Sequence, residues 1–146
     1  MLRIDIKKLN PNAVIPKQAH AYDAGVDLHA CIDTPLTIMP HHTAKVGTGL
    51  AMAIPTGFAG LIYARSGLAT KMGLRPANCV GVVDAGYRGE FIVALHNDTD
   101  YPQTIAPSER IAQLVISPVM GAWFNEVDEL EETERGEGGF GSSGRL

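Results

Sequence analysis

The sequence predicts an all-β protein, and three observations support this prediction. Nine prolines and sixteen glycines are spread along the 146 residues and interrupt the apolar stretches. Most of those stretches are about four to eight residues long, and several alternate apolar with polar residues, which is typical of strands. The strand–helix–strand repeat of a parallel nucleotide-binding fold is missing. Short strands with glycine and proline turns indicate a sandwich, barrel or jelly roll.

The expected strands lie in apolar runs separated by turn residues. In order they are AVIP (13–16), GVDLHACI (25–32), LTIMP (36–40), TAKVGTGLAMAIP (43–55), GFAGLIYA (57–64), NCVGVVDAG (78–86), EFIVALHN (90–97), QTIAP (103–107) and RIAQLVISPV (110–119). One short helix is expected at residues 66–74, with Gly73 as its stop. Residues 125–139 are acidic and then glycine-rich, and we expect there a late strand or short arm that leads into a mobile tail.

Composition and charge disfavour several classes of protein. The length fits one domain, and the formal net charge of −4 disfavours a nucleic-acid-binding surface, which is normally basic. No apolar run approaches the roughly 18 residues of a membrane span, and the N-terminal MLRIDIKKLN has no apolar core of a secretory signal. Cys31 and Cys79 form no CxxC motif, so we interpret them as free thiols of a cytoplasmic protein. The histidines have no HxxxH or HExxH spacing, so a zinc site is not expected.

Residues 64–70, ARSGLAT, place a guanidinium, a hydroxyl and a glycine where an expected strand meets the expected helix. Ser66 could cap that helix. Free backbone N–H groups at a helix start, together with Arg65 and Ser66, would form an anion site. The alternative is a capped helix with a surface arginine.

Residues 78–90, NCVGVVDAGYRGE, predict a hairpin. CVGVVD has the pattern of a buried strand, AG that of a turn and YRGEFIVAL that of the returning strand. The hairpin would place Asp84 and Tyr87 close together at one end. A carboxylate that leaves an apolar strand is partly desolvated, which would make Asp84 a better proton acceptor. The alternative is that Asp84 only initiates the turn.

Asp27 lies inside the alternating strand that begins at Val26. A carboxylate at this position needs a partner, which would be an arginine, a backbone amide or a hydrated metal ion. The alternative is an exposed strand face. Residues 108–116, SERIAQLVI, predict a turn followed by a strand in which Arg110 and Gln113 are the polar groups.

The chain ends RGEGGFGSSGRL, a stretch that should not fold alone because ordering each residue costs roughly 1–2 kcal/mol. Arg135 could bind a phosphate as a planar fork, and Phe140 could stack on a base. Ser142 and Ser143 could donate to phosphate oxygens. We interpret the tail as a lid that orders when ligand contacts offset its entropy. The alternative is a disordered terminus.

Five stretches, in this order, resemble the five motifs of the trimeric dUTPases. They are AGVDLHA (24–30), ARSGLA (64–69), GVVDAGYRGE (81–90), RIAQLVI (110–116) and RGEGGFGSSG (135–144). The resemblance implies a distorted β-barrel of jelly-roll type with one short helix, assembled as a homotrimer whose active sites lie between subunits. It also implies a barrel domain at residues 1–126 and, at residues 127–146, an acidic arm with a mobile lid that closes over an active site.

The resemblance further implies hydrolysis of dUTP to dUMP and pyrophosphate, which removes dUTP and supplies dUMP for thymidylate synthesis. Mg²⁺ is the implied cofactor. No direct protein ligand to the metal is implied, because the triphosphate and water would hold it. Asp27 matches the acid of the first motif, which supports either a neighbouring site or a water bound to the metal.

The family's site residues match positions of this chain one by one. Asp84 matches the aspartate that deprotonates the water attacking the α-phosphorus. Tyr87 matches the tyrosine that packs against the deoxyribose and leaves no room for a 2′-hydroxyl, and Asn78 matches the asparagine that reads uracil. The other matches are Val82, Val83 and Ile92 in the uracil pocket, Arg65, Ser66, Gly67 and Gln113 at the phosphates, and Arg135, Phe140, Gly141 and Ser142 in the lid.

Two rival functions follow from the same pattern. A dCTP deaminase has a related trimeric β fold, but its catalytic glutamate would fall at Ala94, and the glycine-rich lid favours dUTPase. A non-catalytic module that binds a nucleotide or a protein would be expected to have a broken catalytic motif, and none is visible. Departures from the family pattern are small: Gly86 stands where some members carry a second acid, and Ser143 stands where Thr is frequent.

Overall fold

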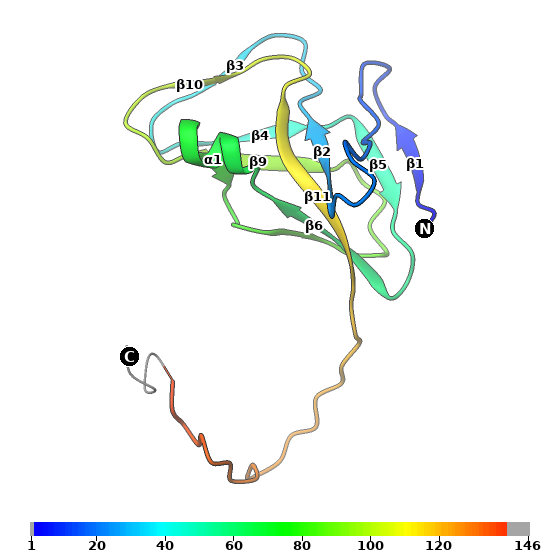
Figure 1. Ribbon diagram of the computed structural model, residues 1–146, viewed down its shortest axis with the longest axis vertical. Helices are drawn as coiled ribbons and strands as arrows, with labels where there is room; N and C mark the ends of the chain where they lie inside the picture. The colour runs from blue at the N-terminus through cyan, green and yellow to red at the C-terminus, as the bar shows by residue number, and fades with distance from the viewer. Residues whose placement is uncertain (1, 140–146) are drawn as a thin grey trace.

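The computed structural model describes residues 2–139, and this part of the chain folds into eleven strands and one short helix (Figure 1). The elements in chain order are β1 (Asp5–Lys8), β2 (Gly25–His29), β3 (Leu36–Ile38), β4 (Thr43–Gly47), β5 (Leu50–Ala53), β6 (Phe58–Tyr63), α1 (Ser66–Met72), β7 (Leu74–Pro76), β8 (Gly81–Val83), β9 (Ile92–Asn97), β10 (Gln103–Ile105) and β11 (Arg110–Pro118). The predicted all-β class with one short helix is confirmed. Strands β1 and β7 were not predicted, and residues 13–16 form no strand.

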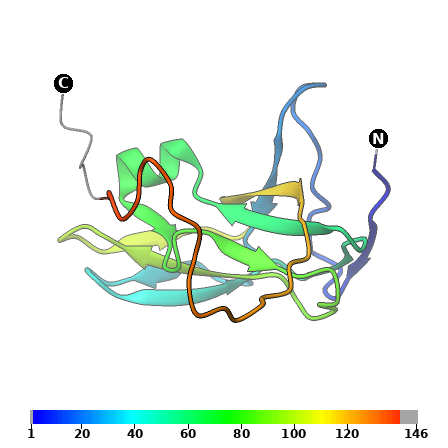
Figure 2. The ribbon, with the colours of Figure 1, turned by 90° about the horizontal axis from the view of Figure 1, so that it is seen from below.

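The strands are divided among four antiparallel sheets. Their orders are β1-β5, β10-β3, β2-β11-β6-β8 and β4-β9-β7. None of these sheets closes on itself over residues 2–139, so the expected barrel is not present as a closed ring of paired strands. Figure 2 shows the two larger sheets in separate layers.

The hydrophobic core lies between these two layers. Leu28 and Ile111 contribute from the four-stranded sheet, and Val93 and Leu95 contribute from the three-stranded sheet. Burying each such side chain stabilises the fold by about 1.5–3 kcal/mol relative to leaving it exposed. The core therefore fixes β2 and β11, which carry Asp27 and Gln113, in one layer and β9, which begins at Ile92, in the other.

The helix ends where the sequence predicted. Gly73 occupies the C-cap with φ 61°, a left-handed conformation that glycine adopts without strain, and its N–H donates to the Ala69 carbonyl at 3.2 Å. Leu74 belongs to β7 rather than to the helix. The predicted cap was wrong, because Arg65 holds the N-cap position without a side-chain cap bond and Ser66 is already helical.

The predicted hairpin between residues 79–84 and 87–95 was also wrong. Strand β8 pairs with β6, whereas β9 pairs with β4 and β7 in the other large sheet. The segment between β8 and β9 therefore passes from one layer to the other. Nor is the first of these strands buried, since Val82 is 64% exposed.

Residues 119–139, named the strap below, follow β11 and contain no helix or strand. Of the two structures expected near residue 125, an arm is therefore observed instead of a strand. Figure 1 shows the strap leaving the end of β11 and running clear of the body. Its large apolar side chains are exposed, most of all Met120 at 96%, Phe124 at 94%, Leu130 at 87% and Trp123 at 83%. Among the described residues, no helix is both long and apolar enough to cross a bilayer.

Candidate functional site

A pocket of about 240 Å³ opens beside β8 and contains six of the predicted site residues. They are Asn78, Val82, Val83, Asp84, Tyr87 and Ile92. The remaining lining residues are Ile62, Gly81, Glu90 and Phe91. The pocket thus combines an amide, a carboxylate and a phenol with an apolar wall, a composition common in small-molecule sites.

The turn after β8 brings Asp84 and Tyr87 together. The backbone N–H of Tyr87 donates to the Asp84 carbonyl at 3.0 Å. The Tyr87 hydroxyl donates to the Glu90 carbonyl at 2.9 Å, and its ring lies 6.3 Å from the Phe91 ring at an interplanar angle of 45°. The predicted proximity of Asp84 and Tyr87 is therefore correct, although a turn between two sheets produces it and not a hairpin.

Gly89 leaves the space that the Tyr87 ring occupies. A methyl group at Gly89 would lie 2.6 Å from Cζ of Tyr87 and would also overlap the hydroxyl. The ring consequently lies across the backbone at Gly89, and any larger residue would displace it. In contrast, a methyl group at Gly86 in the same turn would contact nothing within 4 Å.

The side chain of Asp84 is exposed in the single chain, so the expected partial desolvation is not observed there. No side chain within residues 2–139 hydrogen-bonds to its carboxylate. A carboxylate in this position is free to accept a hydrogen bond from water.

Asn78 is presented by a tight turn after β7. The N–H of Cys79 donates to the Pro76 carbonyl at 3.0 Å, and Cys79 has φ 63°. The N–H of Val80 then donates to the Asn78 carbonyl at 2.7 Å. This turn projects the Asn78 amide into the pocket from the edge of β8.

A second cluster lies across β2, β11 and the end of β6. Oδ1 of Asp27 accepts a hydrogen bond from Nε of Arg65 at 2.7 Å, and Oδ2 accepts one from Nη1 of Arg110 at 3.2 Å. Of the partners considered for Asp27, arginine is the one observed. Gln113 pairs with Asp27 on one side and Tyr63 on the other, and its Nε2 donates to the Ala64 carbonyl at 2.9 Å.

A cleft of about 270 Å³ adjoins this second cluster. Asp27 and Gln113 line it together with Lys17 and Asp23 from the preceding loop. The cluster offers guanidinium groups, an amide and a lysine, which are donors suited to an anion. Over residues 2–139 there is no group of three or more His, Cys, Asp or Glu side chains placed to hold a metal ion.

In the described part of the chain the two clusters line different cavities. Arg65, Ser66, Gly67 and Gln113 are absent from the lining of the 240 Å³ pocket, and so is Arg135, as far as the described residues extend. Nε of Arg135 instead donates to the Gly138 carbonyl at 2.8 Å. The other predicted lid residues, Phe140, Gly141 and Ser142, lie outside the described residues.

Comparison with known protein families identifies this arrangement. The dUTPase family model matches residues 11–144, nearly the whole chain. The chain belongs to the dUTPase family. The matched region contains every motif on which the resemblance was based, from Asp27 to Ser142.

Curated relatives in the family are close to this chain over its full length. Deoxyuridine 5'-triphosphate nucleotidohydrolase of Rhodococcus erythropolis is 51% identical over 144 residues, which cover 98% of this chain and 87% of the relative. The protein of the same name from Paraburkholderia phymatum is 46% identical and covers 99% of both chains.

Solved structures in the family share the fold. The dUTPase of Staphylococcus bacteriophage 80alpha, solved with dUpNHpp, superposes with a TM-score of 0.86 at 32% identity and covers 99% of both chains. A point mutant of the same phage enzyme gives a TM-score of 0.88 at 33% identity and covers 97% of this chain and 98% of its own.

Two site residues of this family member were missed in the sequence. Glu90 lines the pocket, and its Oε1 accepts the Gly49 N–H at 2.8 Å, which ties the pocket to the β4–β5 turn. Burial, followed by the nearby Glu90 charge, raises the pKa of the Cys31 thiol. Arg110 was noted only as a polar group. Neither residue has a local sequence signal, because the partner of Glu90 (Gly49) and the partner of Arg110 (Asp27) are distant in the chain.

Proposed function

We propose that this chain hydrolyses dUTP to dUMP and pyrophosphate. The observation that carries the proposal is the 240 Å³ pocket, which places the amide of Asn78, the carboxylate of Asp84 and the ring of Tyr87 around one space. Membership of the dUTPase family supports the same reading, as does the phage enzyme solved with dUpNHpp.

In the proposed complex, Asn78 reads uracil together with the backbone of Val82, Val83 and Ile92. An amide can match both a uracil carbonyl and the imide N–H, whereas cytosine would leave buried groups unpaired. The ring of Tyr87 packs against the deoxyribose and leaves no room for a 2′-hydroxyl. Its bond to the Glu90 carbonyl supports this role, since it holds the ring in one orientation.

Asp84 acts as the general base in this proposal. It takes a proton from a water molecule while the water oxygen forms a bond to the α-phosphorus. The bond between that phosphorus and the bridging oxygen breaks, and pyrophosphate leaves with the electron pair. The exposed carboxylate of Asp84, which is free of described side-chain partners, supports this assignment.

Arg65, Ser66, Gly67 and Gln113 are proposed to hold the phosphates, with Mg²⁺ as the cofactor. The donor set fits a metal held through water: Asp27 accepts one bond from each of two arginines, and an ionised carboxylate has about four lone-pair sites. When bound, Mg²⁺ would clamp the triphosphate and neutralise charge on the leaving pyrophosphate.

A homotrimer with active sites between subunits would unite the two clusters, which lie apart in one chain. Exposed apolar side chains of the strap and an apolar groove of about 440 Å³, lined by Ile4, Val26 and Ile116 among others, support self-association.

We also propose a jelly-roll-type body at residues 1–126 and an arm with a lid at residues 127–146. In the lid, Arg135 and Ser142 would hold phosphates, and Phe140 and Gly141 would cover uracil. The two cysteines are unpaired, which suits a cytoplasmic location.

The test is pyrophosphate release in the presence of Mg²⁺, with dUTP, dTTP, dCTP and UTP offered separately. Release from dUTP alone would establish the activity together with its base and sugar selectivity. Ammonia released from dCTP would indicate a deaminase instead. Tight binding of dUTP without any release would contradict the proposal and indicate a binding module.

A further inference from the structure

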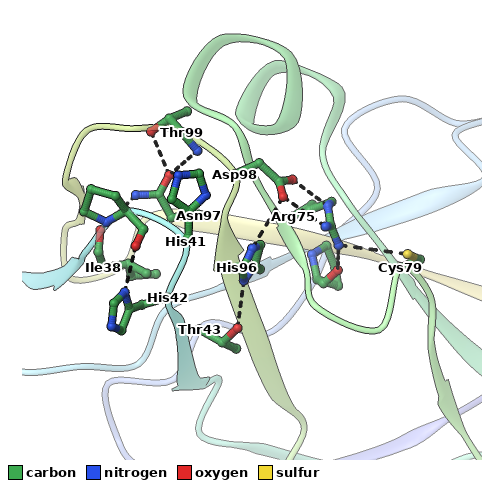
Figure 3. Close-up of polar contacts among 12 residues, drawn as sticks. Ile38, His41, His42, Thr43, Arg75, Cys79, His96, Asn97, Asp98 and Thr99 are labelled. Atoms are coloured by element: carbon green, nitrogen blue, oxygen red, sulfur yellow. Dashed lines mark hydrogen bonds and ion pairs between the residues drawn. The ribbon is translucent and has the colours of Figure 1, made fainter.

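Outside the two clusters, Arg75 of β7 links the end of β9 to the turn that carries Asn78 (Figure 3). Its Nε donates to Oδ2 of Asp98 at 2.6 Å, and its Nη2 donates to Oδ1 at 3.0 Å. This two-bond fork, named the Arg75–Asp98 fork, is a geometry that lysine cannot reproduce. The third nitrogen, Nη1, donates to the Pro76 carbonyl at 3.2 Å and lies 4.0 Å from the sulfur of Cys79.

The Asp98 end of the fork is firmly anchored. The backbone N–H of Asp98 donates to the Gly73 carbonyl at 2.9 Å. The preceding Asn97 is fully buried, and its side chain donates to the carbonyls of Ile38 at 3.0 Å and Tyr101 at 2.7 Å. A buried, fully bonded amide of this kind makes its surroundings rigid. The Asp98 carboxylate is therefore held in place and can orient the Arg75 guanidinium.

The turn at the other end is tied to β9 by one backbone bond, from the Ala77 N–H to the Ala94 carbonyl at 2.8 Å, and has few other restraints. Ala77, Asn78 and Cys79 are all exposed, so burial does little to hold them. The Pro76 carbonyl accepts both the Cys79 N–H that closes the turn and the Nη1 donor of Arg75. Within residues 2–139, Arg75 is the one side chain from outside the turn that bonds to it.

We propose that Arg75 is a positioning residue that fixes the turn carrying Asn78 and thereby sets the affinity for the pyrimidine base. The inference rests on the proposed function, because it takes Asn78 as the group that reads uracil. Recognition by an amide depends on its donor and acceptor facing the matching atoms, so a small displacement of the turn weakens binding. Asp84 and Tyr87 follow β8, which is held by its pairing with β6, so we expect the chemical step not to depend on the fork.

The kinetic test compares Arg75→Gln, Asp98→Asn and their double variant with wild type. The matched control is Asp100→Asn, which removes the 2.9 Å contact between His41 and Asp100 in the loop after β9 without touching the turn. We expect KM for dUTP to rise about three- to tenfold in each fork variant, with kcat within about twofold. The double variant should be no worse than either single one, and Arg75→Lys should recover only part of the loss.

A second measurement follows the turn itself without turnover. Cys79 lies in the turn and is exposed, and Asp98→Asn breaks the fork while keeping the Arg75 charge, which lies 4.0 Å from the Cys79 sulfur. The rate at which iodoacetamide alkylates Cys79 in Asp98→Asn, resolved by mass spectrometry, therefore reports on the conformation of the turn. Cys31 serves as the reference thiol in the same chain. We expect loss of the fork to change the Cys79 rate at least about twofold while the Cys31 rate and the control variant stay unchanged.

The outcomes separate the two proposals. A wild-type protein that releases no pyrophosphate from dUTP overturns the proposed function, while the Cys79 rates still test the fork. An active wild type with unchanged KM in Arg75→Gln and Asp98→Asn overturns the positioning role. A lower kcat together with faster alkylation of the partly buried Cys31 would show general destabilisation, and this result would also overturn the positioning role.

Discussion

Oδ1 of Asp27 and Nε of Arg65 lie 2.7 Å apart and join the second strand to the residue before the helix. The two side chains are only 28% and 26% exposed, so water screens the pair less than it would a surface ion pair. The second oxygen of Asp27 accepts a bond from Arg110. One carboxylate therefore orients two arginines where phosphate binding is proposed.

Replacing Asp27 with Asn should lower kcat/KM for dUTP about tenfold or more. The amide keeps the shape but removes the charge, and a hydrogen bond to a charged group contributes about 1.5–3 kcal/mol. Steady-state pyrophosphate release measures the effect. Asp33→Asn, an exposed carboxylate after β2, is the control. An Asp27→Asn enzyme within twofold of wild type would show that Arg65 needs no help in positioning.

Replacing Asp84 with Asn should lower kcat about 100-fold or more, because general base catalysis contributes roughly 10²–10⁴ to the rate. Binding should persist, since the amide is of the same size. Single-turnover rates and calorimetric titration with dUTP would measure the two effects separately. A near-normal rate would remove Asp84 as the base.

Replacing Gly89 with Ala should reduce discrimination between dUTP and UTP. The methyl group would displace the Tyr87 ring and open space for a 2′-hydroxyl. We expect the ratio of kcat/KM values for dUTP and UTP to fall about tenfold, which is the range for a change of one carbon in a pocket. Gly86→Ala in the same turn meets nothing within 4 Å and is the matched control. If both variants keep the wild-type ratio, the ring does not depend on Gly89.

Truncation after Glu134 should lower kcat for dUTP about tenfold or more while leaving the assembly intact. The removed segment contains every proposed lid residue, and a lid acts by excluding water and completing the site. Turnover and light scattering on the same sample measure activity and mass. A truncated protein with full activity would contradict the lid.

The stability contribution of Asp98 should depend on pH. Its hydrogen bond with Arg75 holds the pKa of Asp98 below the usual range. A carboxyl group whose pKa is lower in the folded state stabilises the fold above its unfolded pKa of about 3.9, and the contribution disappears as pH falls through the folded pKa. Asp98→Asn should therefore lower the free energy of unfolding at pH 7, with a difference that shrinks as the pH falls below the unfolded pKa of about 3.9.

Urea unfolding of wild type and Asp98→Asn at a series of pH values measures this dependence. Asp33→Asn, at an exposed carboxylate after β2, serves as the control. A difference between wild type and Asp98→Asn that stays constant from pH 7 to pH 2 would contradict the ionic origin of the stabilisation.

Local patterns predicted most strands and the end of the helix, because alternation and Gly73 act within a few residues. β1 was missed because DIKK is mostly charged, and it forms a strand only by pairing with β5. The hairpin prediction failed because it, too, depended on which strands pair. Two neighbouring apolar runs suggest mutual pairing, yet β8 and β9 find their partners in different sheets. Which strands pair depends on contacts between distant segments, and local sequence does not encode them.

In the candidate site, too, local contacts could be predicted from the sequence and contacts between distant segments could not. The closeness of Asp84 and Tyr87 was predictable, because only Ala85 and Gly86 separate them and the contact is local. The contacts of Asp27 with Arg65 and Arg110 span 38 and 83 residues. The family motifs named Asp27 and Arg65 without saying that they touch. The structure supplies that relationship, and with it the role of Arg110.

The chain contains a single tryptophan, Trp123, and it lies on the strap with 83% of its surface exposed. An indole in water emits at longer wavelengths than one packed among apolar groups. The intrinsic fluorescence of this protein therefore reports on one segment alone, without any engineered label. A blue shift on raising the protein concentration would follow the strap as it docks, and the same signal recorded during dilution would give the rate at which it comes away.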